Sequence, residues 1–280
     1  MFIGIYPMLA MAAAGFSIYQ LVSSGFSFGW MGLLLTTGPM MSVIMWLMMF
    51  KTRARTSAHF PLITLLALTG LGLTTYEYFA NQQGELSTLL FTGLGFSTFI
   101  IYNYWYSSLG RGNNNRFTMG TKLPIFKVTD NTAREVSSES FLGHPTVIVF
   151  FRGNWCPLCM AQIKEITSQY KNLSALGTKI KFISPQPQKN TIKLADKHGM
   201  NFDFYTDKGN KAAKTLDIEM MNGLPMGMEM LGYDSDTVLP TVIITDKNGF
   251  IVYSDQTNNY RIRPEPREFL KILLSTKVVA

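Results

Sequence analysis

The first 110 residues contain four apolar stretches of about twenty residues each, and this feature restricts the fold more than any other. The stretches run over residues 2–22, 29–50, 60–80 and 86–106. A helix of about 20 residues is long enough to cross the hydrocarbon core of a bilayer. Residues 1–110 carry only five charged side chains, whereas the rest of the chain carries 38. We therefore predict four transmembrane helices in a membrane region over 1–110, followed by a water-soluble part.

Loop charge predicts the orientation of these spans. The loop after the second span contains Lys51, Arg53 and Arg55, and further basic residues follow the fourth span between 111 and 122. The other two loops between spans contain no Lys or Arg. Because basic loops face the cytoplasm, we expect a multi-pass inner-membrane or plasma-membrane protein with a cytoplasmic C-terminal domain. An error of one span would put that domain on the opposite side.

The spans offer few reactive groups. They contain no cysteine, and the nearby His59 lies at a predicted interface. Glu77 is the ionisable residue near a span, and we expect it to extend to the headgroups rather than mark a proton path. We therefore interpret the membrane region as an anchor in the lipid bilayer or as a binding surface for a membrane-protein partner.

The soluble part begins with a polar linker over 111–119 and continues as a domain over 120–280. Its apolar runs alternate between strand and helix patterns. Strands are predicted at 146–151, 179–184, 202–205, 241–246 and 250–254, and helices at 157–176, 188–198, 208–217 and 266–275. This order predicts an α/β thioredoxin-fold domain with a mixed central sheet flanked by helices.

The chain has two cysteines, and both lie in the sequence Cys156-Pro157-Leu158-Cys159. Two cysteines in 280 residues cannot form a disulfide scaffold, and the pair follows a strand at the start of a helix. Free N–H groups and the helix dipole favour an anion there, so we expect a lowered pKa at Cys156. Pro157 suits the first helical position because it needs no N–H partner. We predict that Cys156 attacks and that Cys159 resolves the mixed species as a redox-active disulfide.

The sequence supports a metal site or nucleic-acid binding less well than it supports a redox-active cysteine pair. A zinc site would need two more ligands, and His144 and His198 are not at ligand spacing. The methionine-rich run over 220–230 could bind copper, but it also suits an adaptable apolar surface. The basic surplus is scattered and forms no nucleic-acid motif. We expect no metal, no cofactor and no nucleic-acid partner.

Four segments resemble one family. Residues 150–159 contain Arg152-Gly-Asn-Trp155-Cys-Pro-Leu-Cys159, which is similar to the Arg-Gly-x-Trp-Cys-Pro-x-Cys motif of the peroxiredoxin-like branch of the alkyl hydroperoxide reductase/thiol-specific antioxidant superfamily. Residues 123–126 resemble the first strand of that family, 239–246 its proline-initiated strand, and 260–266 its Tyr-x-x-Arg-x-Glu-Pro tail. The resemblance covers about 120–275 and not the membrane region.

The resemblance implies a cis bond between Leu239 and Pro240, facing the sulfurs. This sequence also departs from the pattern of the family at two positions. Gly153 and Val149 occupy positions where peroxiredoxins carry a hydroxyl residue and a proline that hold the peroxide. Arg152 either stabilises the thiolate or is solvated. Trp155 is expected beside Cys156, where burial would oppose ionisation.

We therefore predict a membrane-anchored thiol–disulfide oxidoreductase that acts on protein or small-molecule thiols and disulfides. A thiol-dependent peroxidase with an antioxidant role, acting on peroxides through the same cysteines, is the enzymatic alternative. A redox-sensing membrane subunit without catalytic turnover is the third interpretation.

Overall fold

The computed structural model describes residues 2–82, 84–112, 114–199 and 202–275. Small parts of the predicted regions lie outside these ranges, namely residues 1, 83, 113, 200–201 and 276–280. The chain divides into two compact units. The first contains the chain up to Lys51 together with Ser57–Ser108, and the second contains Thr52–Thr56 and the chain from Leu109 onward. The short segment Thr52–Thr56 therefore belongs to the second unit, although it lies between two helices of the first.

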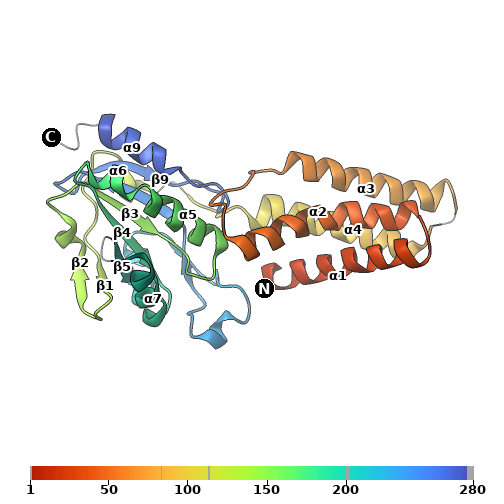
Figure 1. Cartoon of the computed structure of the whole chain (residues 1–280), viewed down its shortest axis with the longest axis horizontal. Helices are drawn as coiled ribbons and strands as arrows, with labels where there is room; N and C mark the ends of the chain where they lie inside the picture. Colours follow the sequence, from red (N-terminus) through yellow and green to blue (C-terminus); the bar gives the residue numbers. More distant parts are fainter. Residues whose placement is uncertain (1, 83, 113, 200–201, 276–280) are drawn as a thin grey trace. The chain divides into compact units, whose positions relative to one another are not determined.

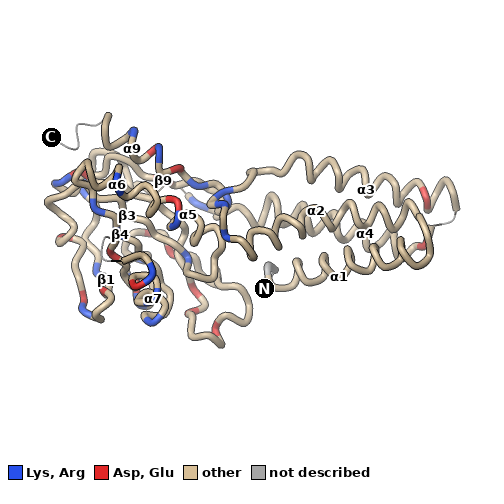
Figure 2. Tube along the Cα trace, in the orientation of Figure 1, with Lys and Arg blue, Asp and Glu red and all other residues tan. Residues whose placement is uncertain are grey.

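The first unit consists of long apolar helices (Figure 1). They are α1 (Phe2–Ser23), α2 (Phe28–Phe50), α3 (Pro61–Phe79) and α4 (Leu86–Ile100), and α4 continues into a π-helical turn over Ile101–Tyr106. By length and composition, four helices in the described part of the chain are able to cross a membrane. Figure 2 shows how few charged residues these helices carry.

The helices of this unit bury several polar groups beside an apolar core and expose many large apolar side chains. Thr36, Thr74 and Thr92 are buried, and each donates its hydroxyl to the carbonyl four residues earlier in its helix. Large apolar side chains such as Val22 and Leu62 are exposed. A water-soluble bundle has the reverse distribution, whereas a bundle surrounded by lipid buries its polar groups.

Two glycines allow α2 and α3 to approach closely. A Cβ atom on Gly32 would lie 2.4 Å from the carbonyl oxygen of Gly70, and a Cβ on Gly70 would lie 2.4 Å from that of Gly32. Small residues at a helix crossing permit such backbone contact, which is common between membrane helices.

The prediction that Glu77 extends toward headgroups is wrong. Glu77 is 8% exposed and accepts hydrogen bonds from the N–H groups of Phe28 and Gly29 and from the hydroxyl of Ser27, at 2.9, 2.6 and 2.9 Å. It therefore caps the N-terminus of α2, where unpaired N–H groups favour a carboxylate. The sequence did not reveal this contact, because the start of α2 lies 48–50 residues away from Glu77 and only the tertiary fold brings them together.

The second unit is built on a seven-stranded mixed sheet with the order β2-β1-β5-β4-β3-β8-β9. Its strands are β1 (Lys127–Thr129), β2 (Glu135–Ser137), β3 (Thr146–Phe150), β4 (Lys179–Ser184), β5 (Asp203–Thr206), β8 (Thr241–Thr245) and β9 (Ile251–Asp255). Strands β3, β4 and β5 are parallel, and β8 and β9 follow antiparallel. Helices α5 (Pro157–Ser168), α6 (Tyr170–Ser174), α7 (Gln188–His198), α8 (Lys211–Thr215) and α9 (Pro266–Ser275) flank the sheet. The predicted thioredoxin-like domain with a mixed sheet is confirmed.

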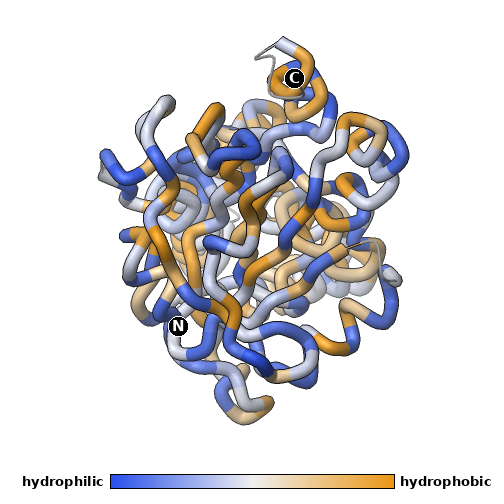
Figure 3. The backbone as a smooth tube through the Cα atoms, turned by 90° about the vertical axis from the view of Figure 1, so that its left-hand side faces the viewer, coloured by the Kyte–Doolittle hydropathy of each residue, from blue (hydrophilic) through white to orange (hydrophobic). Residues whose placement is uncertain are grey.

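The central strand β3 is buried along its whole length, as its run of β-branched and aromatic residues predicts. Ile148 and Phe150 belong to a core cluster with Ile183, Ile243 and Ala212. The intervening residues of β3 are equally buried, so helices or loops cover both faces of the sheet. Figure 3 shows the hydrophobic residues along these strands.

Several predicted elements differ in detail. The helix predicted over 157–176 is two helices, because α5 ends at Ser168 and α6 starts at Tyr170. The helix predicted over 208–217 is a short 3₁₀ turn (Lys208–Asn210) followed by α8, since Gly209 and Asn210 have positive φ. A two-stranded sheet of β6 (Glu219–Met220) and β7 (Thr237–Val238) was not predicted. Further 3₁₀ turns span Asn115–Phe117, Ser138–Phe141 and Met228–Leu231.

Candidate active site

The two cysteines lie where β3 passes into α5. The loop after Phe150 leads to Cys156, which is the N-cap of α5, and Pro157 is the first residue of that helix. Cys159 lies in the first helical turn. Cys156 is 3% exposed and Cys159 is fully buried, and both are free thiols. The structure thus brings the predicted pair together on one helical turn, with Pro157 at the position where a missing N–H has no cost.

One residue from a distant part of the sequence, Arg263, contacts Cys159. Arg263 donates from Nη2 to the Sγ of Cys159 at 3.5 Å, and from Nη1 to the Oε1 of Gln162 at 2.8 Å. Gln162 lies on α5, three residues after Cys159. Arg263 is 4% exposed, so its charge acts in an environment that screens it weakly. Gln162 fixes the guanidinium, and the guanidinium supplies positive charge to the sulfur.

The two sulfurs share one proton. Burial raises the pKa of the Cys159 thiol, but the hydrogen bond from Cys156 and the charge of Arg263 outweigh it and lower that pKa to about 5. The hydrogen bond to Cys159 raises the pKa of Cys156 well above its ordinary value, and burial raises it further. The surroundings of the pair therefore favour ionisation of Cys159 over ionisation of Cys156.

The expected lowering of the Cys156 pKa is not found in this geometry. The helix N-terminus favours an anion at Cys156, but the guanidinium of Arg263 contacts the sulfur of Cys159. Cys156 then donates its proton to that thiolate. From the sequence we based the predicted pKa of Cys156 on the helix dipole and Arg152. Arg263 was not considered, because only the tertiary fold brings it to the helix.

Arg152 is buried rather than solvated. Its guanidinium lies over the rings of Trp155 and Tyr260, at 5.1 and 5.8 Å from their centroids. Its Nη2 donates to the carbonyl of Gly223 at 2.7 Å. The charge of Arg152 lowers the pKa of both cysteines, although it is the smallest of the contributions at Cys156. Arg152 therefore adds to the positive field at the pair, and it attaches the methionine-rich loop to the site.

Trp155 occupies the place where a side chain on residue 153 would lie. A Cβ on Gly153 would meet the Nε1 and Cδ1 atoms of Trp155 at 2.7 and 2.8 Å. Gly153 also has φ +149°, which disfavours other residues. The hydroxyl residue that peroxiredoxins carry at this position cannot be accommodated without moving the indole. Trp155 thus replaces that side chain sterically.

The prediction of a cis bond between Leu239 and Pro240 is wrong, because the described backbone contains no cis peptide bond. The chain runs extended from β7 into β8. Leu239 donates its N–H to the carbonyl of Ile218 at 2.8 Å, and Thr241 Oγ1 bonds back to the carbonyl of Leu239 at 2.8 Å. Arg111 donates to the carbonyl of Pro240. The last two contacts hold the carbonyls of Leu239 and Pro240, and the first holds the N–H of Leu239.

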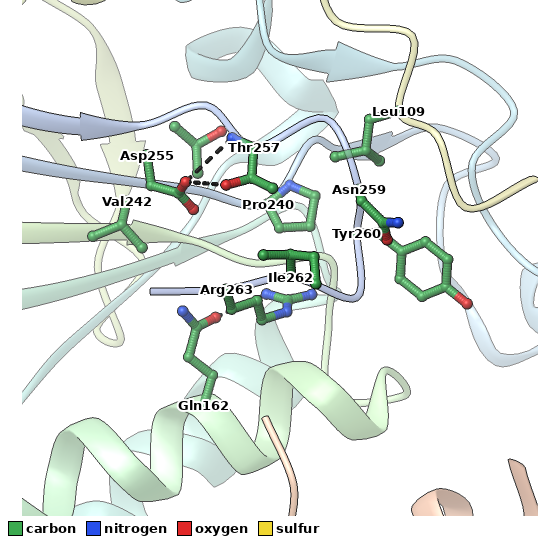
Figure 4. Close-up of a pocket in the computed structure, with 11 residues that line it drawn as sticks. Leu109, Gln162, Pro240, Val242, Asp255, Thr257, Asn259, Tyr260, Ile262 and Arg263 are labelled. Atoms are coloured by element: carbon green, nitrogen blue, oxygen red, sulfur yellow. Dashed lines mark hydrogen bonds between the residues drawn. The ribbon is translucent and has the colours of Figure 1, made fainter. Parts of the chain in front are cut away.

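Pro240 and Leu239 border two different hollows. Pro240, Gln162 and Arg263 line a cavity of about 10 Å³, shown in Figure 4 with Arg263 beside Gln162. This is room for roughly one water molecule, so no larger substrate fits there. Leu239 lines a wider hollow of about 380 Å³ with Arg111 and Met220.

Buried donors surround the pair. The side-chain atoms Arg152 Nε, Trp155 Nε1 and Arg263 Nε are buried and have no acceptor within the described ranges. Native structures leave few such groups unpaired, and active sites are a common place for them. No three His, Cys, Asp or Glu side chains that the structure describes come together as metal ligands. The site is rich in hydrogen-bond donors and positive charge, which suits oxygen atoms that gain negative charge.

Sequence reasoning missed Arg263, Gln162 and Tyr260 as site residues. Arg263 and Tyr260 lie in the Tyr-x-x-Arg tail, whose resemblance was recognised but given no role. Gln162 follows Cys159 by three residues, which places both on one helix face. Helical spacing was therefore an available signal for Gln162.

Comparison with known proteins finds similarity to peroxiredoxins. Residues 119–254 match the AhpC/TSA family. The chain is 28% identical over 168 residues to a chloroplastic peroxiredoxin Q of Sedum lineare, covering 58% of this chain and 81% of that protein. It is 24% identical over 104 residues to a putative peroxiredoxin bcp of Haemophilus influenzae, covering 37% and 67%. A solved structure, the peroxidoxin BcpB of Mycobacterium tuberculosis, aligns with TM-score 0.47 and 16% identity over 57% of this chain and 98% of that one.

The fold and the dithiol define a thiol-based redox enzyme of the thioredoxin superfamily, and that prediction is confirmed. Within this superfamily the domain is peroxiredoxin-like, as the motifs indicated, and residues 119–254 match the model of the AhpC/TSA family. The family match lies within residues 119–254, so it does not include α1–α4.

Proposed function

We propose that the protein is a thiol-dependent peroxidase in which Cys156 attacks the peroxide and Cys159 resolves the product. The observation that carries the proposal is the contact of Arg263 with Cys159 Sγ at 3.5 Å. Such a pair holds one thiolate at neutral pH beside the thiol it will activate. The similarity to peroxiredoxins supports peroxide as the oxidant.

Cys159 thiolate is the base for the first step. It accepts the proton of Cys156, whose sulfur then attacks the terminal oxygen of a hydroperoxide. The O–O bond breaks, Cys156 becomes a sulfenic acid, and the leaving alkoxide takes the proton back from the Cys159 thiol, which yields an alcohol and restores the Cys159 thiolate. Buried N–H groups of Arg152 and Trp155 are available to stabilise the departing oxygen.

Cys159 then closes the reaction. Its thiolate attacks the sulfur of the sulfenic acid, a disulfide forms, and hydroxide leaves to become water with a proton from solvent. The lowered pKa of Cys159 keeps this nucleophile ionised at neutral pH. Two thiols of an external reductant would return the pair to its reduced form and leave as a disulfide.

Dithiol–disulfide exchange is a second candidate function, and Gly153 is the observation that favours it. The absence of a hydroxyl at this position removes one of the groups with which peroxiredoxins hold the peroxide. The Cys-Pro-Leu-Cys pair on one helical turn is also typical of disulfide oxidoreductases. In that case Cys156 would attack a disulfide of a protein or small molecule.

Turnover with two oxidants distinguishes the candidates. The full chain would be reduced and mixed with a thiol reductant and either a hydroperoxide or the disulfides of insulin. We expect kcat/KM for the hydroperoxide to exceed that for insulin at least about tenfold, and to vanish in Cys156→Ser. Faster reduction of insulin with negligible peroxide consumption would support the exchange function instead.

We also infer that α1–α4 anchor the protein in a lipid bilayer with the redox domain in the cytoplasm. The lengths of the helices, their exposed apolar side chains and their buried threonines support insertion. The basic segment with Arg53 and Arg55 supports the orientation. Segment Thr52–Thr56 belongs to the redox unit, which supports placing that segment and the redox domain on the same side of the membrane.

A further inference from the structure

The segment Thr52–Thr56, which connects α2 to α3, forms part of the redox unit. Ala54 is 1% exposed, and Thr56 donates its N–H to the carbonyl of Arg261 at 3.1 Å. Arg55 donates from Nε to the carbonyl of Arg263 at 3.1 Å. Two successive residues of this segment therefore hold the backbone from which the Arg263 side chain extends.

Arg55 also binds the helix that carries Cys159. Its guanidinium forms an ion pair with Glu165 on α5 at 2.5 Å, and a longer one with Glu265 at 3.5 Å. One side chain therefore joins α5 to the strand-like segment around Arg263. The contact between Arg263 and Cys159 is made between these same two elements.

Two prolines follow Arg263 closely in the sequence. Arg263 precedes Pro264, and Pro266 follows two residues later. Proline has no N–H to donate and keeps the preceding residue extended, so this stretch cannot secure itself by regular backbone pairing. Its carbonyl at residue 263 is held by Arg55 instead.

We propose that Arg55 is a positioning residue that holds Arg263 against the Sγ of Cys159. This role rests on the thiol–thiolate pair of the proposed function but does not depend on peroxide as the substrate. It assigns a redox function to the connection between α2 and α3, which lies outside the family match.

The small contribution of this ion pair to folding stability distinguishes a positioning role of Arg55 from a purely stabilising one. The side chains of Arg55 and Glu165 are 28% and 32% exposed. Pairs with this exposure contribute little to stability, so loss of Arg55 should leave the fold intact. The distance between Arg263 and Cys159, in contrast, determines how much the thiolate is favoured.

The test is a pH titration of thiolate absorbance in the reduced full chain, without peroxide. In Arg55→Ala we expect the midpoint to rise by about one pH unit, with an approximately fivefold slower alkylation near pH 5. Arg53→Ala is the matched control, because Arg53 is exposed in the same segment and makes none of these contacts within the described chain. Its midpoint should equal that of the wild type.

Arg55→Lys distinguishes geometry from charge. Lysine keeps the positive charge, but it cannot hold the carbonyl of Arg263 and the carboxylate of Glu165 with a planar fork. We expect it to shift the midpoint nearly as far as alanine does. Glu165→Gln should shift it in the same direction by a smaller amount, which keeps the proposal testable if Arg55→Ala does not fold.

An unchanged midpoint in a folded Arg55→Ala protein would overturn the proposal. So would a wild-type midpoint in Arg55→Lys, because the effect would then be one of charge alone. Peroxide turnover is not part of the readout, so a negative result here leaves the peroxidase proposal untouched, and failure of the peroxidase proposal leaves this one intact.

Discussion

Arg263 contacts the sulfur of Cys159, 104 residues earlier in the chain, through a single N–H group at 3.5 Å. This contact places the cation on the second cysteine of the pair rather than on the first. The helix N-terminus alone would favour a thiolate at Cys156. The fold thus separates the two roles: Cys159 stores the negative charge, and Cys156 holds the proton that must leave before attack.

Replacing Arg263 by glutamine should raise the pKa of the thiolate. An opposite charge within about 4–6 Å lowers an acid's pKa by roughly 1–3 units, so its removal should move the midpoint up from about 5 by at least one unit. Thiolate absorbance against pH measures this. Arg267→Gln is the control, because Arg267 is exposed on α9. Equal midpoints in the two variants would show that Arg263 does not stabilise the thiolate.

The stability of the reduced protein should depend on pH through both cysteines. The pKa of Cys159 is lowered to about 5 in the folded protein, below its unfolded value of about 8.5. Its contribution is therefore complete above about 8.5 and is lost as pH falls toward 5. The raised pKa of Cys156 has the opposite sign, since its contribution is complete below about 8.5 and is lost at higher pH.

Denaturant unfolding of the reduced full chain between about pH 5 and 9, compared with Cys159→Ser, measures the first contribution. The difference between the two proteins should grow with pH. A difference that stays constant over this range would mean that no thiolate with a lowered pKa exists in the pair.

Gly153 should tolerate no side chain while Trp155 is present. Gly153→Ala places a Cβ 2.7 Å from the Trp155 Nε1 and forces a residue with φ +149°, so we expect a loss of about 1–3 kcal/mol and slower thiol reactivity. Thermal unfolding and alkylation rate measure the two effects. In a Trp155→Ala background the same substitution should be less harmful, because only the backbone strain remains. Equal losses in both backgrounds would rule out the steric role of Trp155.

Local signals predicted most of the redox domain. The buried run of β3, the Cys-Pro start of α5, and strand β4 and helix α7 follow from residue patterns that no tertiary contact overrides. The break between α5 and α6 and the short α8 were missed, since they depend on backbone conformations at single residues.

The site was predicted less completely than the fold. The cysteines are adjacent in sequence, so their pairing was visible, whereas Arg263 and Glu77 act on partners far away in the chain. Long-range contacts of this kind are set by packing, and a single sequence does not show them. The cis bond that the resemblance implied between Leu239 and Pro240 is also absent from the described backbone.

The proposed orientation predicts which ends of the helices are accessible from outside the cell. In a Cys156→Ser/Cys159→Ser background, Asn81→Cys lies in the loop between α3 and α4 and Ser168→Cys lies at the exposed end of α5. A membrane-impermeant thiol reagent on intact cells should label the first and not the second, and permeabilised cells should show both labelled. The reverse pattern in intact cells would place the redox domain outside.

Oxidation by a stoichiometric amount of hydroperoxide tests the central claim most directly. The reduced full chain, Cys156→Ser and Cys159→Ser would each be mixed with one equivalent, quenched with acid and analysed by peptide mass spectrometry. We predict a Cys156–Cys159 disulfide in the wild type, a sulfenic acid on Cys156 in Cys159→Ser, and no rapid oxidation in Cys156→Ser. Rapid peroxide consumption by Cys156→Ser, with the oxygen on Cys159, would contradict the assigned roles of the two cysteines.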